Sequence, residues 1–307
     1  MTIKELAYSA QLHLEAETGC PFKRAHVYEL MAASFGFSSY AALNACAVFT
    51  EHQAGGLRPR SSLTLQRSTA LGYSPAVTAH VARALPMFLD SRQIACIRID
   101  ALVRILETGW VTDAAEDMGL WSDEPDTEVE DLGYIDSNEF SSAACLMDGL
   151  HAAAGKGSAI AHYALALIHE PDDDTEDALG GAHWSRERRL GRVLSGAERE
   201  WADAHDVLEV RRADYERHLR EAARLGSRRA QLDLASRFGD PLFFEQAGNA
   251  VEGLDAAEVA GIAEAIQRVD DARHWWTEAA QNGDVDAMRR LIELDGQRDP
   301  IWCWTWF

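Results

Sequence analysis

Apolar residues recur every three or four positions along most of this chain, which is the spacing that places side chains on one face of an α-helix. Near the start, Leu6, Ala10, Leu12 and Leu14 lie near one side and predict a helix from Thr2 to about Glu17. The same periodicity predicts a second helix from Lys23 to Phe35. The opening of the chain is therefore expected to be helical.

Two related phrases mark expected turns between helices. Gly36-Phe37-Ser38-Ser39 and Gly72-Tyr73-Ser74-Pro75 stand 36 residues apart. Glycine accepts the left-handed conformation that ends a helix, serine caps the next helix, and proline suits a first helical turn. Between the phrases, Gly55, Gly56 and Pro59 predict a linker. Residues 93–108 form a further apolar segment, predicted as a helix, although its first part is rich enough in isoleucine for a strand.

The second half of the chain repeats the phrase Ala-Ala-x-x-Gly-x-x-x-Ala three times. Each copy has an apolar residue three or four positions before the alanine pair and another four positions after the last alanine. This pattern predicts one helix that ends at the glycine and a second that starts after it, with alanines that let neighbouring helices approach closely. The copies are Ala153, Ala154, Gly157 and Ala161; Ala222, Ala223, Gly226 and Ala230; and Ala279, Ala280, Gly283 and Ala287. The predicted fold class is all-α, a solenoid of stacked helix pairs.

The third copy carries a longer pattern, Ala-x-x-Trp-x-x-x-Ala-Ala-x-x-Gly-x-x-x-Ala, with Ala272 and either Trp275 or Trp276 before the phrase. This spacing resembles the Sel-one-like repeat, a relative of the tetratricopeptide repeat, over roughly residues 140–295. The resemblance implies a right-handed superhelix of helix pairs that acts as an adaptor, and it does not imply an enzyme. The earlier copies keep only the Ala-Ala, Gly and Ala part. Glycine intervals of 69 residues (157 to 226) and 57 residues (226 to 283) indicate inserts that the compact family pattern lacks.

Four segments are expected from these patterns. They are an N-terminal helical module at 1–53, a second helical module at 60–112, an acidic hinge at 113–139, and the repeat domain at 140–307. The aromatic tail, residues 301–307, is interpreted as a cap on the last helix pair, because a helix array needs its end face covered. An exposed anchor for a partner is the alternative interpretation of the tail.

The net charge of −21 is concentrated in the middle of the chain. Residues 111–180 hold 1 basic and 18 acidic side chains, against 10 and 8 in residues 1–110 and 18 and 24 in residues 181–307. Such a field repels phosphate backbones and attracts basic proteins. We therefore expect a basic protein partner, bound by acids of this segment: Asp123, Glu124, Asp126, Glu128, Asp172, Asp173, Asp174 and Asp177.

Motifs for phosphate and nucleic-acid binding are incomplete. Gly155-Lys156-Gly157-Ser158 has part of a phosphate loop, but Leu150 stands where the first glycine belongs, and glycine follows the lysine. The Gly-aromatic-Ser phrases have helix-turn-helix spacing. However, residues 38–50 contain no Lys or Arg, and residues 74–91 contain only Arg83, so phosphates would find few cations there. We expect these phrases to be packing units.

Metal and disulfide motifs are also incomplete. His162 and His169 lie seven residues apart on one helical face, and we interpret them as packing or surface residues. An alternation of acids from Asp172 to Glu176 is similar to the start of a calcium loop, but Asp177 stands where glycine is needed. The cysteines, which lack CxxC spacing, are interpreted as buried or free thiols: Cys20, Cys46, Cys96, Cys145 and Cys303. No metal or other cofactor is expected.

The sequence therefore favours a protein–protein interaction scaffold, in the form of an acidic, immunity-like inhibitor that sequesters a basic toxin or nuclease. A signalling or assembly adaptor is the alternative of the same class. A nucleic-acid-binding regulator that uses the N-terminal modules is the alternative of another class. No nucleophile or acid–base pair points to an enzyme. No apolar run approaches the roughly 18 residues of a membrane span, and Glu5 interrupts any leader, so we expect a cytoplasmic protein.

Overall fold

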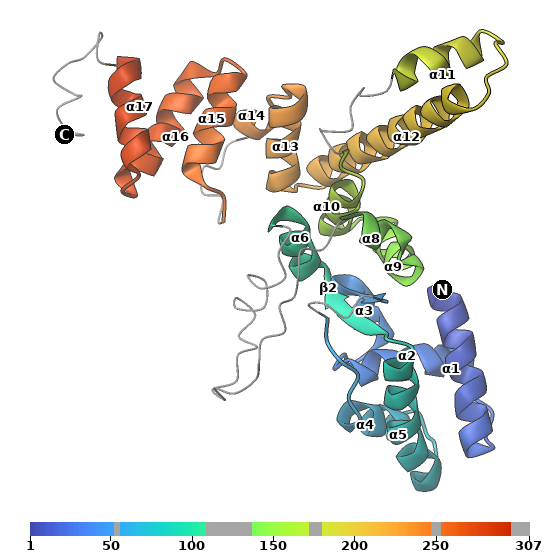
Figure 1. The fold of residues 1–307 in the computed structure, drawn as a ribbon. Coiled ribbons are helices and arrows are strands. Elements are labelled where there is room, and N and C mark those ends of the chain that lie inside the picture. The colour runs from blue at the N-terminus through green and yellow to red at the C-terminus, as the bar shows by residue number, and fades with distance from the viewer. Residues whose placement is uncertain (52–55, 109–136, 172–179, 247–252, 296–307) are drawn as a thin grey trace, which may run out of the picture. The chain divides into compact units, whose positions relative to one another are not determined.

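The computed structural model describes residues 1–51, 56–108, 137–171, 180–246 and 253–295. The described chain is mostly helical, which confirms the predicted class (Figure 1). It divides into two compact units, Met1–His218 and Leu219–Phe307. The long helix α12 (Ala197–Arg224) contains the boundary between them. The four segments expected from the sequence are finer than these units, and that division stays a prediction.

The first unit contains helices and one small sheet. Its elements in chain order are α1 (Ile3–Thr18), α2 (Arg24–Ser34), α3 (Tyr40–Cys46), β1 (Ala47–Thr50), α4 (Ser62–Ala70), α5 (Pro75–Ser91), β2 (Ala95–Arg98), α6 (Ile99–Thr108), α8 (Ser137–Ser142), α9 (Ala144–Ala154), α10 (Ala159–Ile168), α11 (Gly181–Arg189) and the first part of α12. The second unit holds the rest of α12 with α13 (Arg228–Phe238), α14 (Leu242–Glu245), α15 (Ala256–Ala265), α16 (Val269–Gln281) and α17 (Val285–Asp295).

The N-terminal helices begin where the sequence places caps. Thr2 and Glu5 form a reciprocal capping box at the start of α1. Ser39 and Ser74 each accept a hydrogen bond from the backbone amide three residues on, at the starts of α3 and α5. Pro75 is the first residue of α5, as expected.

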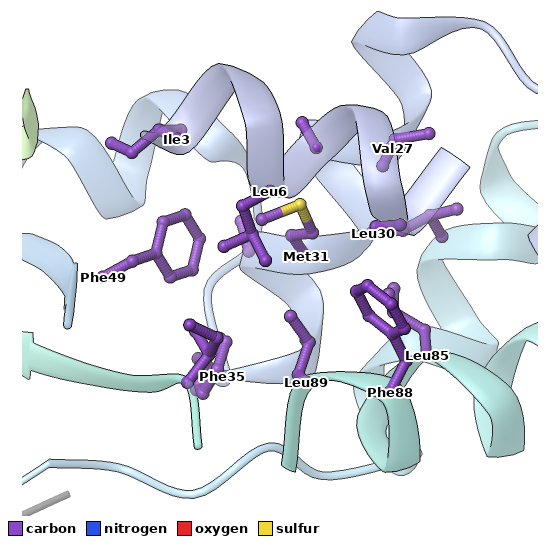
Figure 2. Packing of buried hydrophobic residues seen from close by; sticks show 14 of the residues in the cluster. Ile3, Leu6, Val27, Leu30, Met31, Phe35, Phe49, Leu85, Phe88 and Leu89 are labelled. Atoms are coloured by element: carbon purple, nitrogen blue, oxygen red, sulfur yellow. The ribbon is translucent and has the colours of Figure 1, made fainter. Parts of the chain in front are cut away.

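The core of the first unit lies between α1, α2, α5 and the sheet. Figure 2 shows Leu6 of α1, Leu30 and Met31 of α2, Leu85 of α5 and Phe49 of β1 packed together, and all five are fully buried. Burying a side chain of this size stabilises the fold by about 1.5–3 kcal/mol relative to leaving it in water. These residues fix the N-terminal elements relative to one another.

The small sheet differs from the purely helical expectation. Strands β1 and β2 pair antiparallel, with Val48 opposite Ile97 and Phe49 opposite Cys96. The apolar segment 93–108 thus divides into a strand and α6, which is the outcome that its isoleucines left open. Helix α9 packs on β1 at Gly149, where an added Cβ would lie 2.8 Å from Val48 Cγ1. Only glycine allows this approach without displacement.

The repeated phrase forms the same turn three times. The backbone is left-handed at its glycines, with φ of +86°, +96° and +96° at Gly157, Gly226 and Gly283. In each turn the residue after the glycine donates its amide to the carbonyl of the first alanine, at 3.2, 3.0 and 3.1 Å. This six-to-one hydrogen bond ends a helix in Schellman geometry. The three glycines therefore have equivalent local surroundings.

The last alanine of each phrase belongs to the cap of the following helix. Ser158, Ser227 and Asp284 each accept a hydrogen bond from the amide of the alanine three residues on, with distances of 3.4, 3.3 and 2.9 Å. The phrase is thus a helix stop followed directly by a helix start. The assembly of the helix pairs into a solenoid stays a prediction.

A further turn of this kind in the second unit has no glycine. Gln267, between α15 and α16, has a φ of +64°, and the next amide, that of Arg268, donates to the Ala263 carbonyl at 2.8 Å. Because glutamine stands here where the other turns have glycine, the sequence pattern did not predict this turn. In the same unit, Phe243, Val259 and Trp275 form a buried cluster that joins α14, α15 and α16.

Candidate functional site

All eight acidic residues expected to bind a partner lie outside the described residues. They fall in residues 109–136 and 172–179, so the acidic surface stays a prediction. The same holds for the calcium-like alternation and for the aromatic tail at 301–307. The described part of the chain offers two other arrangements of side chains, an exposed helical hairpin and a histidine cluster, and both involve α12.

The hairpin consists of α11 and the first turns of α12, packed at unusually short range. An added Cβ on Gly181, the first residue of α11, would lie 2.8 Å from the Trp201 carbonyl oxygen and 2.9 Å from His205 Cβ. The absent side chain therefore lets the start of α11 touch the backbone of α12.

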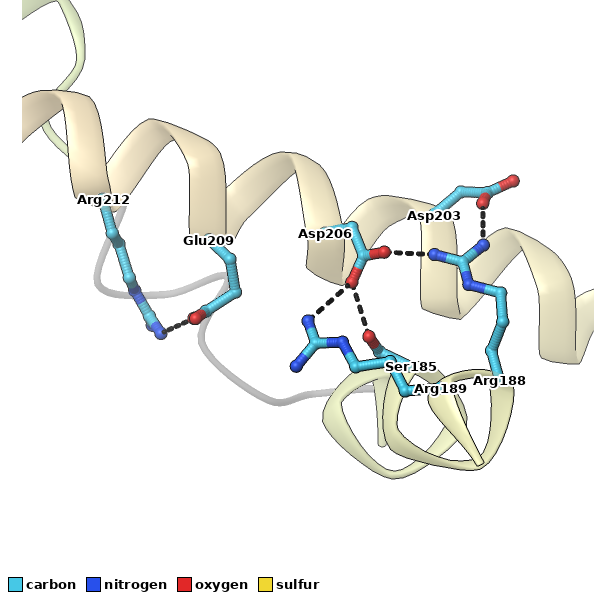
Figure 3. A network of polar contacts seen from close by, with 7 residues as sticks. All are labelled: Ser185, Arg188, Arg189, Asp203, Asp206, Glu209 and Arg212. Carbon is cyan, nitrogen blue, oxygen red and sulfur yellow. Dashed lines mark hydrogen bonds and ion pairs between the residues drawn. The ribbon is translucent and has the colours of Figure 1, made fainter. Parts of the chain in front are cut away.

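An ion-pair network joins the two helices further along the hairpin (Figure 3). Asp206 of α12 accepts hydrogen bonds from Ser185 and Arg188 of α11, and Arg189 lies 3.4 Å from it. Arg188 also pairs with Asp203. The hydrogen bond from Ser185, followed by Arg188, lowers the pKa of the Asp206 carboxyl. Because these side chains are partly exposed, each pair adds little stability, and their main effect is to orient α11.

Charges on the hairpin balance each other. Residues 181–210 hold 5 Arg and 6 Asp or Glu side chains, in contrast to the strongly acidic segment that precedes them. A surface of this kind has little net field to steer a charged partner. Any affinity at the hairpin must therefore come from contact.

An apolar strip lies beside the network. Val207 and Val210 are 67% and 63% exposed, and they stand three residues apart on one face of α12. With Arg188, Asp203 and Asp206 they line a shallow groove of about 510 Å³. Beyond the end of α11, Leu190 is 73% exposed and Val193 91% exposed. Apolar groups gathered next to paired charges are typical of a protein–protein contact surface.

The histidine cluster lies where α12 meets α9 and α10. The two histidines noted in the sequence, His162 and His169, both contact His218 of α12, with ring centroids 5.2 and 6.1 Å apart. His151 of α9 completes the group at 5.9 Å. In the sequence, the spacing of His162 and His169 was the only signal of a histidine cluster. His218 lies 56 residues after His162, and the packing of α12 brings it to them.

Hydrogen bonds define the protonation of the central ring. Arg217 lies 3.1 Å from His218 Nε2, and His162 Nδ1 lies 3.0 Å from His218 Nδ1. A guanidinium only donates, so Nε2 must accept, and the proton of a neutral His218 must then sit on Nδ1 and be donated to His162. Burial, then Arg217 and the three surrounding imidazoles, lower the pKa of His218 to about 4. Burial also lowers the pKa of His169, which Asp214 opposes.

The described residues offer few groups for metal, thiol or phosphate chemistry. They contain no group of three or more His, Cys, Asp or Glu side chains placed to hold a metal ion. Their cysteines are unbridged, and burial raises the pKa of the Cys96 thiol far above its ordinary value. Lys156 belongs to the helix turn that ends at Gly157. No helix in these ranges is long and apolar enough to cross a bilayer.

Comparison with known proteins finds no match for this chain. No protein-family model, no curated protein and no solved structure matches it. The resemblance to Sel-one-like repeats therefore stays a prediction that rests on the residues quoted above.

Proposed function

We propose that this protein is a helical scaffold that binds another protein by surface contact and carries out no chemistry on it. The observation that carries the proposal is the apolar strip of Val207 and Val210, which stands exposed beside the Arg188–Asp206 network. The network holds α11 against α12, so the strip is presented on a preformed surface. A preformed surface loses little conformational entropy on binding.

The expected partner is a basic protein. The 18 acids against 1 base in residues 111–180 would raise the rate of encounter with a cationic surface, whereas the charge-balanced hairpin would contribute to the lifetime of the complex. Under this proposal the chain acts as an acidic inhibitor of an immunity-like kind, which covers a cationic surface of its partner. The two alternatives from the sequence, an assembly adaptor and a nucleic-acid-binding regulator, stay predictions.

The test starts by finding the partner through the hairpin itself. A photo-crosslinking amino acid at position 207 captures what lies on the strip in the cells that make the protein, and the captured protein is then purified. Burying two valines contributes on the order of 3 kcal/mol, and charge at these positions opposes burial. The variant Val207→Asp/Val210→Asp should therefore raise Kd at least tenfold, through a faster off-rate. Met87→Asp, at an exposed apolar residue of α5, is the matched control.

Two further measurements complete the test: the salt dependence of the on-rate and the partner's activity in the complex. The on-rate should fall several-fold as the Debye length shrinks to about 8 Å at physiological ionic strength. An inhibitor should abolish the partner's activity at equimolar ratio, whereas an adaptor leaves it intact. If Val207→Asp/Val210→Asp binds as tightly as the parent, the hairpin is not the contact surface, and the proposal is wrong.

A further inference from the structure

The four histidines surround a single buried ring. His218 is 5% exposed, whereas His162 and His169 are half-buried and His151 is exposed. The rings come from three helical elements of the first unit: α9, α10 with its C-cap residue His169, and α12. Arg211 of α12 adds a further link by donating to the Ile168 carbonyl at 3.4 Å. The cluster is thus the place where α12 is fastened to α9 and α10.

A second proton on the central ring breaks this arrangement. His218 Nε2 accepts from Arg217, so a proton there would point at a guanidinium that can only donate. The bond would become a repulsive contact between two cations. A second proton on His162 Nδ1 would likewise remove the acceptor of the His162–His218 bond. Both bonds of the central ring therefore require neutral imidazoles.

The charged surroundings offer little compensation. The charged and titratable groups around the cluster include Arg211, Asp214 and Arg217 from α12, His151 from α9, and His162 and His169 from α10 and its C-cap. The acid Asp214, which opposes the lowering of the His169 pKa, already pairs with Arg217 at 2.8 Å. Protons taken up by the imidazoles would therefore add positive charge beside Arg211 and Arg217, while Asp214 is already engaged in an ion pair.

We propose that the four-histidine cluster is an acid-sensitive latch, which holds α12 on α9 and α10 while its imidazoles are neutral and releases α12 when mildly acidic solution protonates them. Histidine is the side chain whose charge changes in this range. The inference rests on the cluster alone and does not depend on the proposed binding function.

The same geometry opposes a metal site on these rings. A metal on Nδ1 of His218 would require the ring proton to move to Nε2, where Arg217 already donates. A proton between His162 and His218 at 3.0 Å satisfies both nitrogens without that conflict. Metal binding is accordingly an outcome that would contradict the latch.

The difference between the His218 pKa in the latched and released states sets the size of the pH effect on release. The pKa of His218 is about 4 in the latched state, against an ordinary value of 6.5 when released, so the released state binds more protons between these values. Falling pH therefore favours release within that window. The equilibrium constant for release should rise roughly 40-fold between about pH 6.5 and 4.5 from this one group.

Amide hydrogen exchange, corrected for its intrinsic pH dependence, measures this constant. Exchange in residues 211–218 should rise by that factor, while α1 stays protected, because release is local and not global unfolding. His218→Gln removes the titration, since its carbonyl oxygen can accept from Arg217 and its amide can donate to His162. That variant should reduce the rise to a few-fold. His80→Gln, at an exposed histidine of α5, is the control.

A measurement on the unaltered protein guards against a variant that fails to fold. In a histidine NMR titration, His218 should titrate well below its ordinary range. A normal His218 titration would overturn the latch, as would an unchanged pH response in folded His218→Gln. Protection of residues 211–218 that grows with added zinc or nickel at pH 7 would overturn it in favour of a metal site.

Discussion

Replacing Gly149 by alanine places a methyl group where α9 touches β1. The new Cβ would lie 2.8 Å from Val48 Cγ1 and 2.9 Å from Val48 Cβ, whereas carbon atoms at rest stay about 3.5–4.0 Å apart. Because Cβ is anchored to the backbone, Val48 cannot relieve both contacts by rotating. Helix α9 or strand β1 must therefore move by roughly 1 Å.

Two opposing effects set the magnitude. Overpacking in a dense core costs about 1–3 kcal/mol, and the anchored contact favours the upper part of that range. Alanine in place of glycine within a helix returns about 1 kcal/mol. Gly149→Ala should thus destabilise the first unit by about 1–2 kcal/mol, or a few degrees in Tm for a unit of this size.

Denaturant unfolding of matched variants separates the two effects. Gly261→Ala in α15 meets nothing within 4 Å, so it isolates helix propensity and should stabilise its own unit by about 1 kcal/mol. Adding Val48→Ala to Gly149→Ala removes the Cγ1 contact but keeps Cβ, so the rescue should be partial. If Gly149→Ala stabilises the protein as much as Gly261→Ala does, α9 does not approach β1 as described.

Two further substitutions test particular turns and contacts. Gln267→Gly removes the Cβ from a residue with left-handed backbone. The substitution should raise the free energy of unfolding of the second unit by roughly 0.5–1 kcal/mol, after the added flexibility of the unfolded chain is subtracted. A loss of stability in denaturant melts would argue against this turn. Gly181→Ala inserts a methyl group against the Trp201 carbonyl and should loosen α11 from α12; faster amide exchange in α11 with α1 unchanged is the expected readout, and unaltered exchange would refute the close approach.

Local signals in the sequence identified several helix ends, because caps and left-handed glycines act within a few residues. The starts of α1, α3 and α5 are fixed by Thr2, Ser39 and Ser74 in this way. The sequence did not predict the turn at Gln267, because glutamine carries no local preference for positive φ. There, packing of α15 on α16 imposes the conformation that glycine adopts freely elsewhere.

The periodicity of apolar residues could not predict contacts between segments that lie far apart in the sequence. Strand β1 is four consecutive buried residues, a pattern that does not separate a strand from a helix, and its partner β2 lies about fifty residues away. His218 was likewise unremarkable in the sequence, as one of two histidines in a charged helix. Only the folding of α12 onto α9 and α10 gives it three imidazole neighbours.

The contact strip and the latch lie on one helix, yet they are far enough apart to be tested separately. Val207 and His218 are eleven residues apart, which at about 1.5 Å per residue places them roughly 16 Å apart along α12. Substitutions separated by more than about 10 Å without shared partners usually have additive effects. Weaker binding by Val207→Asp/Val210→Asp therefore reports on the strip, and a blunted pH response in His218→Gln reports on the cluster. If the two sets of variants combine non-additively in binding at pH 5 but additively at pH 7, α12 itself transmits protonation of the cluster to the contact surface.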